Sequence, residues 1–189
     1  MKPRHLCTLL LLLILPSAPG AQNPLDAVAE ELEMRQMKRL AAQQSRHGIH
    51  IAPFKSDGCS GGMSQSWKLL ADTLPPFAEY IGDAPPWEHC CRQHDRDYWQ
   101  GETDNGFEKR AQSDARLRAC VRRTGIDQGK EIADTLNLPE QQIVDLIELT
   151  SELMYHAVRV GGGPCTGLAW RWGHGWPECS QPLVPGNQI

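Results

Sequence analysis

The stretch of the chain that decides the fold runs from residue 86 to residue 99, Pro86-Trp87-Glu88-His89-Cys90-Cys91-Arg92-Gln93-His94-Asp95-Arg96-Asp97-Tyr98-Trp99. Side chains four residues apart share one face of a helix, so Cys90, His94 and Tyr98 are expected to form one stripe. Cys91 and Asp95 form a second stripe beside the first. One helix would therefore offer an imidazole and a carboxylate on adjacent faces, each one turn after a cysteine.

A second helix is predicted over residues 105–121, because no proline interrupts it and apolar residues recur at helical spacing. Its predicted inner face comprises Phe107, Ala111, Asp114, Leu117 and Val121. The link at 100–106 is short, and short links favour antiparallel neighbouring helices. If Cys90 is bonded to Cys120, His94 and Asp114 face each other. A carboxylate in that place can fix the tautomer of a histidine that acts as a general base.

The Cys-Cys-x-x-His-Asp run followed by Tyr98 resembles the active-site helix of secreted, calcium-dependent phospholipase A2. Asp114, six residues before Cys120, resembles the second catalytic helix of that family. The resemblance covers roughly residues 57–121, with a gap, and the short link between the helices is similar to that of compact bacterial and fungal members. It implies an all-α, disulfide-crosslinked fold with two antiparallel active-site helices and a calcium-binding-type loop.

The resemblance also implies a mechanism for hydrolysing the fatty-acyl ester of a phospholipid. His94 would take a proton from water, Asp114 would hold the imidazole, and Tyr98 would hydrogen-bond the aspartate. Calcium, as the cofactor, would polarise the ester carbonyl. A second tyrosine of the family pattern is missing, and Tyr80 or Tyr155 is a candidate to replace it.

A glycine-rich loop at residues 57–64 is the candidate calcium loop. Glycines let backbone carbonyls turn inward, and Ca²⁺ prefers oxygen ligands, although such clusters are usually plain turns. By the resemblance, the carbonyls of Gly58, Ser60 and Gly62 would join the Asp95 carboxylate around the ion. The second cysteine and the aromatic residue of the family pattern are absent from this loop.

Six cysteines follow the N-terminal leader, and an even number in an exported chain predicts three disulfides with fifteen possible pairings. The resemblance selects two of these pairs and leaves a third: Cys59–Cys91, Cys90–Cys120 and Cys165–Cys179. A further family bond would join the positions of Asp97 and Ser113. Both of its cysteines are missing here, so no unpaired thiol results.

Residues 1–21 have the pattern of a secretory signal peptide: a basic start, an apolar run at 6–15 and small residues after it. The apolar run is short for a membrane anchor, and Cys7 would be lost with the leader. We therefore expect a single exported domain at 22–189, secreted or periplasmic. Loss of Lys2 and Arg4 removes two positive charges and changes the formal net charge from −4 to −6. That balance argues against nucleic acid as a partner and predicts no strong attraction to anionic membranes.

Further helices are expected at 25–47, near 66–73, at 127–136 and from Pro139 onward, with Gly125 as a break. The apolar positions expected to pack the first of these are Leu25, Val28, Leu32, Met37 and Leu40. The stripe of the last helix comprises Ile143, Leu146, Ile147, Thr150, Leu153, Met154, Ala157 and Val158. We favour a packing role for the first helix, with a place in the substrate channel as the alternative. The last helix and the preceding one form an extension at 126–189.

The tail from Cys165 to Cys179 contains Trp170, Trp172 and Trp176. Indoles that cover the core are the favoured interpretation, and a membrane-interface patch is the alternative.

Two other classes of protein remain compatible with the sequence. One is a calcium- or lipid-binding protein on the same scaffold with little or no turnover. The other is a zinc protein that uses Cys90, Cys91, His89 and His94. The even cysteine count disfavours zinc, because oxidised sulfur cannot serve as a thiolate ligand.

Overall fold

The computed structural model describes residues 24–59, 72 and 84–179. Its helices are α1 (Pro24–Gln44), α4 (Glu88–Gln100), α5 (Gly106–Asp127), α6 (Gly129–Leu136) and α7 (Glu140–Gly161). The described residues contain no strand, which confirms the all-α prediction for this part of the chain. The predicted leader at 1–21, most of the predicted helix near 66–73, and Ser60, Gly62 and Tyr80 lie outside the described residues.

Helix α4 begins after a pair of prolines and ends at a glycine, with neither residue type between them. Proline stops a preceding helix but is tolerated before a new one, so Pro86 marks the entry. Gly101 takes the left-handed conformation at φ 59°, and its N–H donates to the carbonyl of Asp97 at 3.0 Å. These two signals limit α4 to the segment that carries the predicted stripes.

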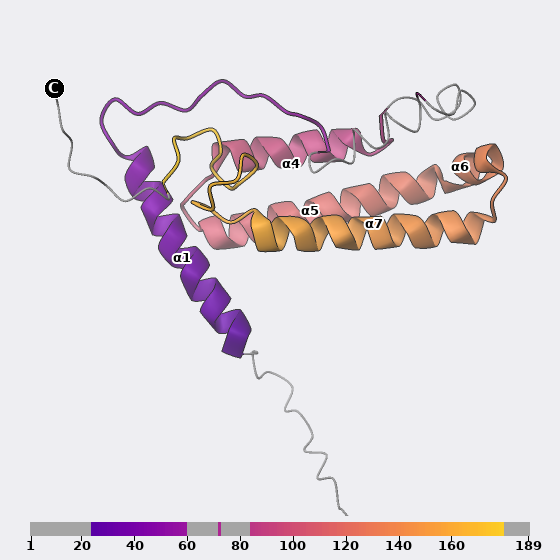
Figure 1. Ribbon diagram of the computed structural model, residues 1–189, viewed down its shortest axis with the longest axis horizontal. Coiled ribbons are helices and arrows are strands. Elements are labelled where there is room, and N and C mark those ends of the chain that lie inside the picture. The colour runs from indigo at the N-terminus through magenta and orange to yellow at the C-terminus, as the bar shows by residue number, and fades with distance from the viewer. Residues whose placement is uncertain (1–23, 60–71, 73–83, 180–189) are drawn as a thin grey trace, which may run out of the picture.

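Helix α5 lies between α4 and α7, and α6 turns the chain at the far end (Figure 1). It runs antiparallel to α4, because Cys90 pairs with Cys120 while His94, one turn later, meets Asp114, further back along α5. Helix α1 crosses the other end of these helices (Figure 1). The predicted antiparallel pair of helices is therefore present.

All three predicted disulfides are present. Cys59–Cys91 and Cys90–Cys120 have Cα–Cα distances of 5.0 and 5.8 Å, and Cys165–Cys179 closes the C-terminal loop. Cys59, Cys90 and Cys91 are buried in a core that α5, α6 and α7 complete with aliphatic side chains. The first two bonds thus fix α4 to the preceding loop on one side and to α5 on the other.

Gly125 does not break the chain, contrary to the prediction. Helix α5 continues through it to Asp127, and the missing side chain lets α7 approach closely. A Cβ at this position would lie 2.6 Å from Cγ2 of Ile147. The glycine therefore serves packing between two helices rather than a turn.

The predicted packing faces of α1 and α7 are only partly correct. In α1, Met37 and Leu40 are buried, whereas Leu25, Val28 and Leu32 are exposed. In α7, Ile143 and Ile147 are buried, while the aliphatic side chains exposed on this helix are Leu146, Leu149, Leu153 and Val160. Met154 and Val158 of α7 are partly buried and pack against the core.

The tryptophan-containing tail covers the end of α4. The indole of Trp172 is buried and donates to the carbonyl of Glu102 at 3.1 Å, and Trp176 donates to the carbonyl of Gln100 at 2.8 Å. Trp172 also meets Tyr98 edge-on, with ring centroids 5.1 Å apart. The interpretation of these indoles as core cover is confirmed for Trp172.

Gly101→Ala is expected to destabilise the protein by several kcal/mol. The left-handed conformation costs an alanine about 1–2 kcal/mol, and its Cβ would lie 2.1 Å from the Cα of Gly173. Gly48→Ala is the matched control, since Gly48 also has positive φ but a Cβ added there would meet nothing within 4 Å. Urea denaturation gives the loss of unfolding free energy in each variant, and the difference between the two losses is the steric cost of the contact with Gly173. Equal losses in the two variants would show that the contact with Gly173 relaxes freely.

Candidate active site

His94 and Asp114 form a buried pair between α4 and α5. The Nε2 atom of His94 lies 2.9 Å from Oδ1 of Asp114, with the two side chains 7% and 0% exposed. An ionised carboxylate only accepts hydrogen bonds, so Nε2 carries a proton, and in the neutral imidazole the lone pair is on Nδ1. Among the described residues, Nδ1 has no hydrogen-bond partner. The imidazole thus has the tautomer that a general base requires.

Tyr98, one turn further along α4, contacts both members of this pair. Its hydroxyl donates to Oδ1 of Asp114 at 2.7 Å, and its ring lies against that of His94 with centroids 4.1 Å apart. Burial and the negative charge of Asp114 raise the pKa of Tyr98 well above its usual value. The phenol therefore keeps its proton and acts as a permanent donor to the aspartate.

Two arginines bind the other carboxylate oxygen of Asp114. Nη1 of Arg159 lies 2.9 Å from Oδ2, and Nη1 of Arg110 lies 3.4 Å from it. Burial alone would raise the pKa of Asp114, but the hydrogen bonds from His94 and Tyr98 and the positive charge of Arg110 lower it below its usual value. Asp114 is consequently ionised throughout the range in which a histidine can act as a base.

The sequence did not identify these arginines as site residues. Arg110 precedes Asp114 by four residues, and an arginine on that face was a signal that could have been used. Arg159 lies 45 residues from Asp114, and no local pattern connects the two. Tyr155, one of the two candidates for the missing tyrosine, lies instead beneath the guanidinium of Arg118.

The depressed pKa of Asp114 predicts a specific pH dependence of stability. A carboxylate with a lowered folded-state pKa stabilises the protein above its unfolded pKa, and this contribution is lost as pH falls through the folded value. Wild type should therefore exceed Asp114→Asn in unfolding free energy by more above about pH 5 than below about pH 4. Urea titrations across this range measure it. A difference that is independent of pH would contradict the assignment.

Asp95 faces the loop that precedes Cys59. Its Oδ2 accepts a hydrogen bond from Oγ of Ser56 at 2.5 Å, and Ser56 in turn accepts one from the N–H of Gly58 at 3.1 Å. Gly58 has φ +74°, which a glycine adopts without strain. Burial raises the pKa of Asp95 despite the Ser56 hydrogen bond, and the nearby negative charge of Asp57 raises it further.

These groups fit a hard dication. The Ser56 hydroxyl and the Asp95 carboxylate present oxygen, and Asp57 adds a second negative charge near that of Asp95. The disulfide between Cys59 and Cys91 keeps the loop one turn from Asp95. Of the predicted calcium ligands, the structure brings together Gly58 and Asp95, which line one pocket.

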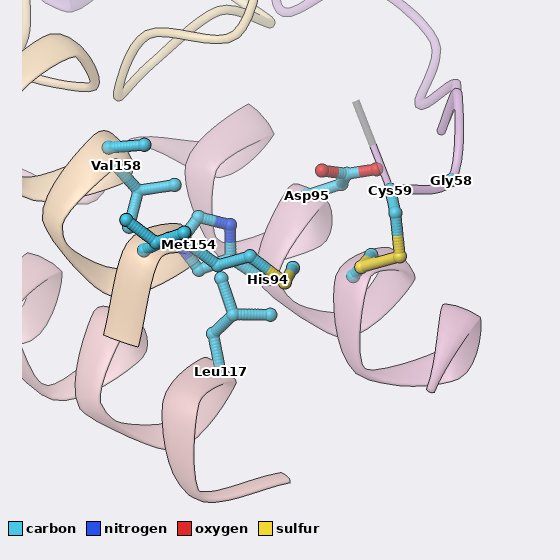
Figure 2. A pocket seen from close by; sticks show the side chains of 10 residues that line it. Gly58, Cys59, His94, Asp95, Leu117, Met154 and Val158 are labelled. Carbon is cyan, nitrogen blue, oxygen red and sulfur yellow. A yellow bond between two sulfur atoms is a disulfide. The ribbon is translucent and has the colours of Figure 1, made fainter. Parts of the chain in front are cut away.

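A mostly apolar pocket of about 250 Å³ joins the two halves of the site (Figure 2). His94 and Asp95 open into it from α4, beside Gly58 and the disulfide of Cys59. The opposite walls come from α5 and α7, with the side chains Leu117, Leu153, Met154, Ala157 and Val158. A hydrocarbon chain would fit this lining, with polar chemistry confined to the α4 wall.

Asp97 and Ser113 are also in contact. The hydroxyl of Ser113 donates to Oδ2 of Asp97 at 2.7 Å, and Arg116 binds the same oxygen at 2.8 Å. A hydrogen bond thus joins the two positions at which the phospholipase pattern places a further disulfide.

The thiolate zinc site is not formed. His89, Cys90 and Cys120 do lie with their ligand atoms within 4.8 Å of one another. However, Cys90 and Cys120 are bonded to each other, and Cys91 is bonded to Cys59. Disulfide sulfur does not provide the thiolate that zinc requires, so the zinc interpretation is wrong for these cysteines.

No protein-family model, no curated protein and no solved structure matches the chain. In the part of the chain that the structure describes, no helix has both the length and the apolar character needed to cross a bilayer.

Proposed function

We propose that this protein is a calcium-dependent, phospholipase A2-like esterase that hydrolyses a fatty-acyl ester of phospholipids. The observation that carries the proposal is the buried His94–Asp114 pair in the wall of an apolar pocket that also contains the Asp95 carboxylate. A general base that activates water, a metal ligand beside it and an apolar lining are elements on which metal-assisted hydrolysis of a lipid ester by water relies. The contact between Asp97 and Ser113 supports the likeness to the phospholipase pattern.

In the proposed reaction, Nδ1 of His94 accepts a proton from a water molecule as the water oxygen bonds to the acyl carbon. Asp114 holds Nε2–H and stabilises the positive charge that forms on the imidazole. The imidazolium then gives its proton to the departing alcohol oxygen as the ester C–O bond breaks. Fatty acid and alcohol are the products, and no side chain forms an acyl intermediate.

Asp95, together with the loop around Gly58, would hold calcium. Bound calcium supplies a Lewis acid that polarises the ester carbonyl. We also propose that the leader at 1–21 exports a single domain at 22–189 to the periplasm or the exterior. The three disulfides agree with an oxidising compartment.

The test is fatty-acid release from mixed phospholipid vesicles by the oxidised protein, with calcium and with chelator. Release should depend on calcium, and Asp95→Asn should weaken calcium binding, measured by calorimetry, at least about tenfold. Asp134→Asn is the control, because Asp134 is an exposed carboxylate paired with Lys130 on α6. Calcium binding without release would contradict the esterase and favour the alternative, a calcium- or lipid-binding protein.

A further inference from the structure

Glu33 of α1 is a buried acid that the proposed reaction does not use directly. It is 9% exposed, and its two oxygens accept from Nε and Nη2 of Arg110 at 2.6 and 2.5 Å. Oε2 of Glu33 also lies 3.3 Å from Nη2 of Arg159. A bidentate arginine–carboxylate pair of this kind is both strong and orienting.

The same two arginines also bind Asp114 of the His94–Asp114 pair, the dyad. Each directs its Nη1 atom at Oδ2 of Asp114, while Oδ1 is taken by His94 and Tyr98. The network therefore joins two carboxylates and two guanidiniums, with a formal charge of zero. Its acid on α1 and the carboxylate of the dyad are 81 residues apart in the sequence and share both cations.

The charge balance has a consequence for catalysis. Without the charge of Glu33, two guanidiniums would compensate a single carboxylate in a medium of low dielectric constant. Both would be drawn toward Asp114, which would become a weaker acceptor for Nε2–H. Their excess charge would also oppose the positive charge that forms on His94 during proton transfer.

We propose that Glu33 is a positioning residue for the dyad, holding Arg110 and Arg159 on one oxygen of Asp114 so that the other remains available to His94. The proposal rests on the hydrolase function proposed above. It also assigns a role to α1, which lies outside the segment with the phospholipase resemblance. The alternative is that Glu33 only fastens α1 to the other helices.

The experiment compares Glu33→Gln with the double variant Glu33→Gln/Arg159→Gln, in which the formal charge of the network returns to zero. Glu31→Gln is the matched control, because Glu31 is on the same helix and pairs with Arg35 in an exposed bridge. One readout is NMR of the His94 ring nitrogens, which reports the Nε2–H tautomer and needs no activity. The other is kcat and KM for fatty-acid release.

Glu33→Gln should weaken the Nε2–H signature and lower kcat roughly 10–100-fold with little change in KM. The double variant should recover most of the Nε2–H signature and most of kcat, and Glu31→Gln should behave as wild type. Unchanged values in Glu33→Gln, or a double variant as impaired as the single one, would overturn the positioning role. If Glu33→Gln does not fold, the double variant is compared with wild type directly, and a lost Nε2–H signature overturns the proposal.

The two proposals fail differently. A wild-type protein that releases no fatty acid, but loses the tautomer signature in Glu33→Gln, would refute the hydrolase and keep the positioning role. If the protein is active and Glu33→Gln changes neither the His94 tautomer nor kcat, the positioning role is refuted and the hydrolase function is kept.

Discussion

His94→Gln is expected to lower fatty-acid release by about 10²–10⁴-fold, the range that a general base contributes. The glutamine amide can still donate a hydrogen bond to Asp114, so the buried carboxylate keeps a partner. It cannot accept and return the proton of the attacking water. Initial rates of release with calcium present measure the effect, and far-UV circular dichroism checks the fold.

The control for this variant is His156→Gln. His156 is on α7, is 70% exposed and lies 4.0 Å from Glu152, away from the dyad. It should keep wild-type activity. A His94→Gln protein as active as this control would show that another group takes the proton, and the proposed mechanism would be wrong.

Arg110→Met is expected to cost about 3–5 kcal/mol of unfolding free energy. The guanidinium is 1% exposed and binds Glu33, Asp114, the Tyr98 hydroxyl and the carbonyl of Val158. Methionine fills much of the volume but leaves two buried carboxylates with Arg159 as their remaining cation. Burial alone would lower the pKa of Arg110, but its hydrogen bonds to Glu33, together with the negative charges that surround it, raise this pKa above its usual value.

Arg35→Met is the matched comparison. Arg35 pairs with Glu31 on the surface of α1, where both side chains are more than half exposed. Exposed pairs of this spacing contribute about 0.3–0.5 kcal/mol, so this variant should remain close to wild type. Urea midpoints, with unchanged m-values, give the change in unfolding free energy of each variant. Equal stabilities for the two variants would mean that the buried network relaxes without loss.

The sequence located the dyad because its two halves are local patterns. Spacing of four residues put His94 and Tyr98 on one face of α4, and the position of Asp114 before Cys120 did the same for α5. Local patterns also predicted the end of α6 at Leu136, its start to within two residues, and the start of α7 to within one residue. Gly125 was misassigned because a glycine that ends a helix and a glycine that admits Ile147 look alike in one sequence.

The arginine network could not be derived in the same way. Glu33, Arg110 and Arg159 are on three different helices, and the ion pairs that connect them span up to 126 residues. Periodicity describes one helix at a time. It gives no information on which charged side chains of two different helices meet. The same limit explains why Leu25 and Leu32 were expected to be buried and are exposed.

The sequence by itself determined the helical character and placed His94 and Asp114 on facing helices, because these features depend on spacing along single segments. The pairing of the cysteines was predicted through the phospholipase resemblance. Tertiary structure alone decided which groups surround the Asp114 carboxylate, and that Ser56 and Asp57 bear on Asp95. Hydrogen bonds and charges act over a few ångströms in space. Their partners are therefore set by how the helices pack and not by their order in the chain.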